Sequence, residues 1–253
     1  MPCRVIAEAG VNWESFSDAV HMIIEAKCAG ADYVKFQLFN EETIADSLFR
    51  ERLKPLILGE TEVRTLKMSA DTEKIGLVLT PMYFEAVDIA AKYADMIKIR
   101  FKDHENDMLI DKAVDTGKPI LISVPGPTMG HSGRTWPFLL RVYPLYNIPK
   151  YPPEPEDFNL DQACACKGMS SHFPHTLFDL AFAINRIYDD VFIEKHVMIN
   201  PLHQPGPRLI NELEHTIEAV YKPIDYDVSI TFEMLKNFIS QLQLIERIQR
   251  TRI

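Results

Sequence analysis

Short apolar segments alternate with longer amphipathic segments along most of this chain, and this alternation restricts the possible folds more than any other feature. The apolar segments lie at residues 5–7, 33–39, 76–80, 96–99, 119–124, 139–148, 169–171 and 191–194. Strands that alternate with helices pair in parallel through right-handed crossovers. About eight such units favour an α/β TIM barrel, the closed (β/α)8 fold, over an open sheet.

The amphipathic segments carry helix periodicity and signals for helix ends. Helices are expected at 17–29, 84–93, 106–116 and 176–188, with another ending near Lys74 and a last one at 231–248. In the first of these, Ser17 is the expected N-cap and Gly30 ends the helix. No clear helix separates the fifth and sixth strands, where residues 125–137 resemble a loop, and residues 150–157 form a proline-rich loop.

Composition, length and net charge indicate which class of protein this chain belongs to. The 253 residues are 47% hydrophobic and 25% charged, which is typical of a soluble globular protein, and the length suits one barrel domain spanning 1–253. The net charge of -9 argues against a nucleic-acid partner, although placed lysines can still bind a small anion. With no signal peptide and no membrane-spanning segment in the sequence, we expect a cytoplasmic protein whose four cysteines are free thiols.

Polar residues lie where the expected strands run into the following loops, which is where barrels of this type carry their chemistry. They are Glu8, Asn12, Lys35, Gln37, Thr80, Lys98, Arg100, Ser123, Tyr151, Ser170, His172, Glu194, Lys195 and His196. Because side chains alternate along a strand, Lys35 and Gln37 are expected to share one face, and Glu194 and His196 likewise. A lysine is costly to bury without a partner, so Lys35 and Lys98 are the most informative of these residues. The alternative is a pair of lysines that reach solvent at the barrel rim.

Two histidines are expected at the ends of adjacent strands. Neutral imidazoles of His172 and His196 that converge there can bind a divalent metal, and the alternative is two ordinary polar histidines. His175 lies three residues after His172 and competes with it as a ligand; we prefer His172.

Several motifs made of these residues resemble the N-acetylneuraminate (sialic acid) synthase family. They are IAEAGVN (6–12), GADYVKFQLF (30–39), LTPMYFEAVD (79–88), KI (98–99), TGKPILIS (116–123), YPPEPEDFNL (151–160), GMSSH (168–172), IEKH (193–196) and PGP (205–207). The motifs occur in the family's order and span nearly the whole chain, so the resemblance also implies a TIM barrel.

The resemblance implies a transferase that condenses phosphoenolpyruvate with an open-chain N-acylaminosugar aldehyde, giving a sialic-acid-type 2-keto-3-deoxy acid and phosphate. A divalent metal, Mn²⁺ by preference over Mg²⁺, Co²⁺ or Zn²⁺, would be held by His172 and His196 and would act as a Lewis acid on the aldehyde. The implied catalytic residues are Glu8, Lys35 and Lys98. The implied substrate-binding residues are Gln37, Thr80, Arg100, Ser123, Tyr151, Ser170, Glu194 and Arg208. A homodimer is the expected assembly.

The sequence also departs from the family pattern. Phe101 stands where the family has a serine that helps bind phosphate, and Pro149 stands where many members have an asparagine. Arg100 or Lys102 are the candidates to replace these contacts, because guanidinium groups suit phosphate oxygens. After PGP, Arg208 replaces an aspartate and favours an acidic acceptor. Typical members carry a C-terminal antifreeze-like domain, and we expect the barrel domain alone.

These departures keep two other functions open. A lyase or aldolase acting on a non-phosphorylated keto acid would suit a weakened phosphate site. A divergent barrel that binds a metabolite or serves as a partner subunit without turnover would explain the substitutions at Phe101, Pro149 and Arg208.

Overall fold

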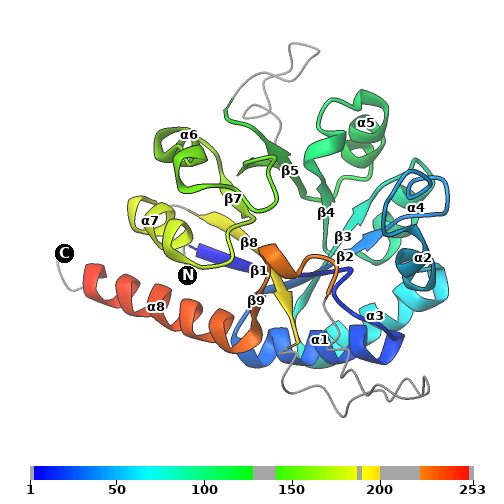
Figure 1. Cartoon of the computed structure of the whole chain (residues 1–253), viewed down its shortest axis with the longest axis horizontal. Coiled ribbons are helices and arrows are strands. Elements are labelled where there is room, and N and C mark those ends of the chain that lie inside the picture. The colour runs from blue at the N-terminus through cyan, green and yellow to red at the C-terminus, as the bar shows by residue number, and fades with distance from the viewer. Residues whose placement is uncertain (1–2, 128–140, 187–189, 200–222, 251–253) are drawn as a thin grey trace, which may run out of the picture.

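The barrel strands occupy the centre of the molecule in the computed structural model, which describes residues 3–127, 141–186, 190–199 and 223–250. Figure 1 shows these strands enclosed by helices. The strands are β1 (Cys3–Gly10), β2 (Tyr33–Leu38), β3 (Gly76–Pro81), β4 (Met96–Ile99), β5 (Ile120–Val124), β6 (Val142–Asn147), β7 (Gly168–Ser171) and β8 (Val191–Met198). Each strand pairs in parallel with the next, and β1 also pairs with β8. The predicted TIM barrel is therefore confirmed.

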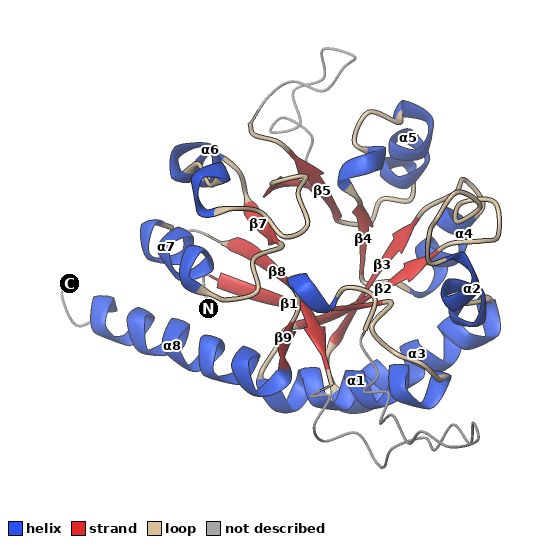
Figure 2. Cartoon of the chain, viewed as in Figure 1, coloured by secondary structure: helices blue, strands red, loops and turns tan. Residues whose placement is uncertain are grey.

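Helices surround the strands, as Figure 2 shows by colour. They are α1 (Phe16–Ala29), α2 (Arg50–Leu53), α3 (Glu60–Glu73), α4 (Ala86–Tyr93), α5 (Asp107–Asp115), α6 (Leu160–Ala165), α7 (Leu177–Asn185) and α8 (Phe232–Arg250). Most of the connection between β5 and β6, including most of the predicted loop at 125–137, lies outside the described residues. None of the helices in the described ranges is long and apolar enough to cross a membrane.

The N-terminus of α1 corrects one prediction. Ser15, not Ser17, caps the helix: its hydroxyl accepts a hydrogen bond from the Asp18 amide, while the Asp18 carboxylate accepts one from the Ser15 amide at 2.8 Å. This reciprocal arrangement satisfies two backbone donors that Ser17, already inside the helix, would leave open. The predicted stop is confirmed, because Gly30 adopts a left-handed conformation with φ 93°.

The end of the chain adds an element that the sequence pattern did not predict. A two-residue strand, β9 (Ile230–Thr231), pairs in parallel with the end of β8, where Val197 faces Ile230. Helix α8 follows directly and packs against α1 and α7. This pairing holds the segment before β9 beside the end of β8. All four cysteines are free, as predicted.

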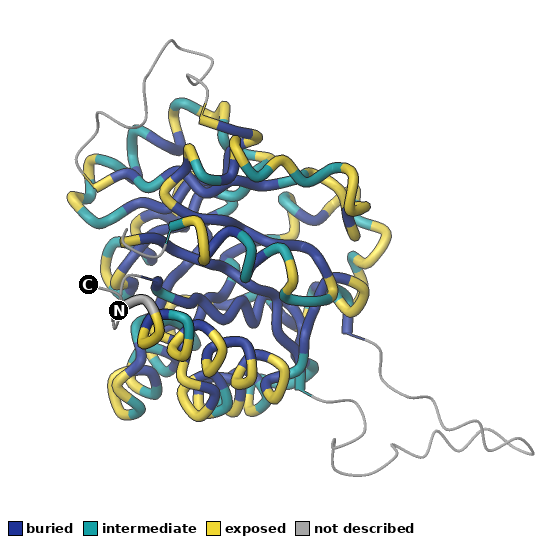
Figure 3. Tube along the Cα trace, turned by 90° about the vertical axis from the view of Figure 1, so that its left-hand side faces the viewer, coloured by how far each residue is buried: buried dark blue, intermediate teal, exposed yellow. Residues whose placement is uncertain are grey.

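The interior of the barrel divides into an apolar layer and a polar one. Figure 3 shows that the buried positions concentrate in the interior of the molecule. The apolar layer consists of Ile6, Val78, Met96, Leu121, Leu145 and Phe192, with Tyr33 and Tyr143 packed against it. Gly168 is the β7 position in this layer. A side chain would not fit there, because a Cβ would lie 2.4 Å from the Phe192 carbonyl oxygen. Because this layer closes one end of the barrel interior, a ligand site can open only toward the other end, where the strands finish.

Candidate active site

A cavity of about 420 Å³ opens at the carboxyl ends of the barrel strands. Its inner residues lie two positions beyond the apolar layer on each strand, since strand side chains alternate between faces. They are Glu8, Lys35, Thr80, Lys98, Ser123, Asn147, Ser170 and Glu194, and the next step outward adds Gln37, Arg100, His172 and His196. The predicted sharing of one face by Lys35 and Gln37, and by Glu194 and His196, is thus observed.

Lys98 and Glu194 form a buried ion pair at the cavity floor. Lys98 Nζ lies 2.8 and 2.9 Å from the two Glu194 oxygens, and both side chains are at most 3% exposed. Ser170 donates a hydrogen bond of 2.7 Å to the same carboxylate. Neither lysine of the site reaches bulk solvent, which rules out the rim alternative for Lys98 and for the similarly buried Lys35.

Lys35 makes the second ion pair of the floor. Its Nζ lies 2.6 Å from Glu8 Oε2 and 3.7 Å from Glu194 Oε2, and it donates to Thr80 Oγ1 at 3.1 Å. Gln37 donates to the other Glu8 oxygen at 2.9 Å. Glu194 therefore links the two lysines, and the floor carries two cations and two carboxylates in contact.

Burial and these contacts act in opposite directions on the pKa values. Burial lowers the pKa of Lys98 below its ordinary value, against the attraction of Glu194. For Lys35, burial also acts to lower the pKa, but Glu194 and Glu8 together raise it. Burial acts to raise the pKa of Glu194, yet Lys35 and Lys98 bring it below its ordinary value. Glu194 is thus ionised near neutral pH, and Lys98 gives up its proton more readily than Lys35.

His172 and His196 meet above this floor, with ring centroids 5.2 Å apart. His172 Nδ1 lies 3.4 Å from the Ile148 carbonyl oxygen, and His196 Nδ1 lies 3.4 Å from Asp225 Oδ2. Burial, and then His196, hold the pKa of His172 well below its ordinary value, so this ring is neutral at pH 7. His172 Nδ1 also lies 3.4 Å from the Asn147 amide nitrogen. Since Nδ1 of each ring is directed toward protein atoms, Nε2 is the nitrogen left to face a ligand.

The structure separates His172 from its competitor. His172 lines the cavity, and the Tyr151 ring lies over it with centroids 4.1 Å apart. His175 is absent from the cavity lining formed by the described residues, and its ring packs against Phe173 and Phe178. The positions thus favour His172 as the partner of His196.

Asn147 lines the cavity, although it was not singled out from the sequence. Pro149 does stand two residues before Tyr151, but the backbone of β6 brings Asn147 into the cavity instead. Its amide nitrogen lies 3.3 Å from the Ser170 carbonyl oxygen, and its buried Oδ1 has no hydrogen-bond partner among the described residues. Its place at the inward-facing end of the predicted strand 139–148 was the available signal.

Asp225 is a cavity residue that the sequence pattern did not reveal. It lies just ahead of β9, and its amide donates to Asn12 Oδ1 at 3.0 Å. Asn12 in turn donates to the Val197 carbonyl oxygen and to Ser229 Oγ. Asn12 therefore holds Asp225 beside His196 and is not itself among the residues that line the cavity. Arg208, the predicted acceptor contact, lies outside the described residues.

Arg100 lines the cavity, but its guanidinium group is already engaged. Nε and Nη2 contact the Asp103 carboxylate, and Nη1 lies 3.0 Å from the Met82 sulfur. Phe101 lines the cavity beside it and stacks on His104 with ring centroids 4.7 Å apart. Lys102 lines the cavity from an exposed position. An apolar ring, an engaged arginine and an exposed lysine therefore occupy this part of the wall.

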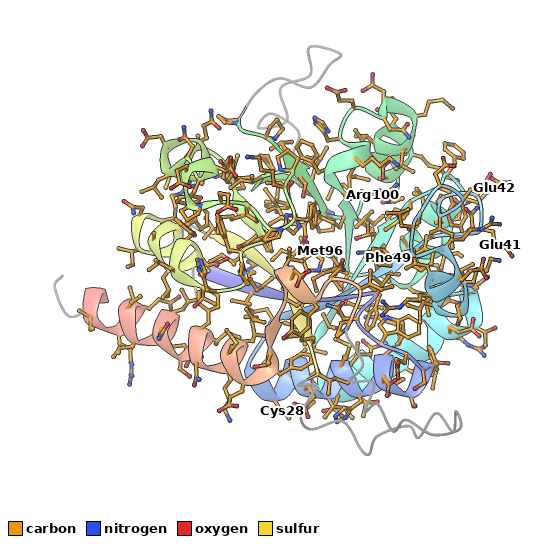
Figure 4. All side chains as sticks on the ribbon, in the orientation of Figure 1. Cys28, Glu41, Glu42, Phe49, Met96 and Arg100 are labelled. Atoms are coloured by element: carbon orange, nitrogen blue, oxygen red, sulfur yellow. The ribbon has the colours of Figure 1, made fainter. Side chains whose placement is uncertain are left out.

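The connection between β2 and α3 forms another wall that sequence patterns did not identify. Its cavity residues are Phe39, Thr43, Ile44, Asp46, Ser47, Phe49 and Leu53. In Figure 4, Phe49 and Arg100 lie nearer the centre of the view than Glu41 and Glu42, which belong to the same connection as Phe49. The outer part of the cavity is thus more apolar than its floor.

Comparisons with known proteins agree with this architecture. The sequence model of the NeuB family matches residues 22–201. A relative from Methanocaldococcus jannaschii, the uncharacterized protein MJ1065, is 28% identical over 262 residues, covering 97% of this chain and 72% of the relative.

Two solved structures share the fold. N-acetylneuraminic acid (sialic acid) synthetase from Leptospira borgpetersenii, in complex with citrate, has a TM-score of 0.77 and 24% identity over 97% of this chain and 84% of that one. The spore coat polysaccharide biosynthesis protein SpsE from Bacillus subtilis has a TM-score of 0.74 and 20% identity over 99% and 70% of the two chains.

Proposed function

This chain belongs to the NeuB family, and from that premise we propose that it condenses phosphoenolpyruvate with an aldehyde sugar in a metal-dependent reaction. The product would be a 2-keto-3-deoxy acid of the sialic acid type. Family membership supports the coarser part of this proposal, an enzyme that acts on sugars. The identity of the acceptor, the metal, the homodimer and the cytoplasmic location are more specific parts of the same proposal.

The observation that carries the proposal is the placement of two buried lysines below two histidines in one cavity. Lys35 and Lys98 supply cationic donors for the carboxylate and phosphate groups of phosphoenolpyruvate. Thr80, Ser123 and Ser170 line the same floor and can donate hydrogen bonds. The histidines lie on the open side of the lysines, where an acceptor aldehyde would enter.

The histidine pair fits a divalent cation. His172 is neutral at pH 7 and, like His196, directs Nδ1 toward a protein oxygen. Such outer contacts fix the ring orientation of histidine ligands and leave Nε2 for the metal. We propose that His172 and His196 hold the cation and that Asp225 orients His196. When bound, the cation supplies Lewis-acid polarisation of the aldehyde oxygen.

The other residues have roles that follow from their places in the cavity. The condensation forms a bond between the methylene carbon of phosphoenolpyruvate and the aldehyde carbon, and addition of water at the adjacent carbon then releases phosphate. Glu8, held by Lys35 and Gln37, is placed to orient that water or accept its proton. Gln37, Tyr151 and Arg100 would contact the acceptor. Glu194 would hold both lysines in place.

One observation favours a second function. Phe101 lines the cavity wall and Arg100 is occupied by Asp103, so of these three neighbouring residues Lys102 alone is left as a cation for a phosphate group. A lyase or aldolase that cleaves or forms a non-phosphorylated keto acid would need only the carboxylate contacts of the floor.

Phosphate release separates the two functions. The protein, loaded with Mn²⁺, is mixed with phosphoenolpyruvate and a panel of aldoses that includes N-acylaminosugars and acidic sugars. We expect phosphate to appear only when both the metal and one acceptor are present, in equal amount to the acceptor consumed. Pyruvate in place of phosphoenolpyruvate is the control. Product from pyruvate, with no phosphate released by any acceptor, would favour the lyase instead.

A further inference from the structure

Lys195 lies between two residues of the cavity and faces away from it. Glu194 and His196, its neighbours on β8, line the cavity, whereas Lys195 points to the opposite face of the strand toward α7. Its side chain is 0% exposed, as is that of Asp179 on α7, 3.2 Å away. Lys195 therefore cannot contact a substrate, and a buried lysine in such a place needs another explanation.

The Lys195 ammonium group is surrounded by oxygen atoms. It donates to Ser171 Oγ at 3.0 Å, to the Phe173 carbonyl oxygen at 2.5 Å and to the His175 carbonyl oxygen at 2.7 Å. The Asp179 carboxylate supplies the opposite charge. An ammonium group has three protons to donate, so these four oxygens use its whole hydrogen-bonding capacity.

Three of the four oxygens belong to the segment that contains His172. Ser171 ends β7 and pairs with Lys195 across the ladder, and the two carbonyl groups follow at Phe173 and His175. This segment turns from β7 into α7 and is not held there by a regular ladder. The bonds to Lys195 span both sides of His172 along the chain, so they fix the backbone from which that ring projects.

We propose that Lys195 is a positioning residue that fixes the connection between β7 and α7, and with it His172, in the arrangement that metal binding requires. This inference rests on the proposed metal site. Lys195 also precedes His196 on β8, so one residue ties together the backbones that carry both histidines. Its effect on the metal is indirect and acts through the orientation of His172.

The test uses Mn²⁺ alone as the probe, with free Mn²⁺ measured by electron paramagnetic resonance. Lys195→Met keeps the length of the side chain and removes all four contacts. We expect its dissociation constant for Mn²⁺ to rise by about 10- to 100-fold, as for loss of an outer partner of a metal ligand. A double variant, Lys195→Met with Asp179→Leu, removes the unpaired buried charge and is expected to regain stability but not Mn²⁺ affinity.

A control separates positioning from general loss of stability. Leu235→Ala leaves a cavity under α8 without touching any of the four Lys195 contacts, and is expected to melt at lower temperature with unchanged Mn²⁺ affinity. In the metal-free protein, hydrogen exchange of the amides at 172–176 should be at least about 10-fold faster in Lys195→Met and unchanged in Leu235→Ala.

The outcomes have distinct meanings. If unsubstituted protein does not bind Mn²⁺, the proposed function loses its metal site. If unsubstituted protein binds Mn²⁺ and Lys195→Met binds it within twofold as tightly, or exchanges at 172–176 at the unsubstituted rate, Lys195 has no positioning role.

Discussion

Replacement of Lys98 by methionine is expected to lower kcat/KM for phosphoenolpyruvate by about 100- to 1000-fold. Removing one partner of a buried charged contact typically costs about 2–5 kcal/mol, and about 1.4 kcal/mol corresponds to a factor of ten. Lys98 is 2% exposed and lies at the cavity floor, so water cannot readily replace its charge. The measurement is steady-state phosphate release with the acceptor that supports turnover.

Matched variants distinguish a direct loss of activity from a loss of folding. Lys98→Met removes the closer of the two lysines that contact the buried Glu194 carboxylate and leaves the longer contact with Lys35, at 3.7 Å, so stability falls as well. Adding Glu194→Gln removes that charge and is expected to restore the melting temperature but not the activity. Lys236→Met, on the exposed face of α8, controls for loss of a positive charge. Activity near the unsubstituted level in Lys98→Met would remove Lys98 from the site.

Replacement of His172 by alanine is expected to raise the dissociation constant for Mn²⁺ by at least about 100-fold. Loss of an outer partner alone commonly costs 10- to 100-fold, and loss of a ligand itself costs more. The neutral state of the ring at pH 7 means that no proton has to leave before a metal binds. The measurement is Mn²⁺ titration followed by electron paramagnetic resonance, with activity measured on the same samples.

His175→Ala is the informative control for this assignment. His175 lies three residues away on the same connection, and its ring packs on Phe173 and Phe178 outside the cavity lining. We expect this variant to retain Mn²⁺ affinity within a few-fold. Retained affinity in His172→Ala combined with lost affinity in His175→Ala would reverse the assignment.

The barrel and its polar layer could be predicted because both follow from local periodicity. Alternation of strands and helices indicates the fold, and the two-residue period then places Lys35 beside Gln37 and Glu194 beside His196. The partners of the lysines could not be predicted. The contact of Lys98 with Glu194 joins β4 to β8 across the barrel, and no local pattern specifies which side chains meet there.

Two cavity residues were missed for different reasons. Asn147 was overlooked because the asparagine was sought at a fixed number of residues before Tyr151. That count takes no account of which β6 side chains face the barrel interior. Asp225 was overlooked because it acquires its place through Asn12 and the short pairing of β9 with β8, which are contacts between distant parts of the chain. The N-cap at Ser15 is a local feature, and the capping box that it forms with Asp18 could have been read from the sequence.

Calorimetric titration of phosphoenolpyruvate into the Mn²⁺-loaded protein tests the central claim most directly. It requires no knowledge of the acceptor and depends on the cavity floor that carries Lys35 and Lys98. We predict binding with a dissociation constant on the order of 1–100 μM, equivalent to about 5–8 kcal/mol, that is lost in Lys98→Met. Absence of heat at millimolar phosphoenolpyruvate would contradict the account and leave keto-acid chemistry or a non-catalytic role for this barrel.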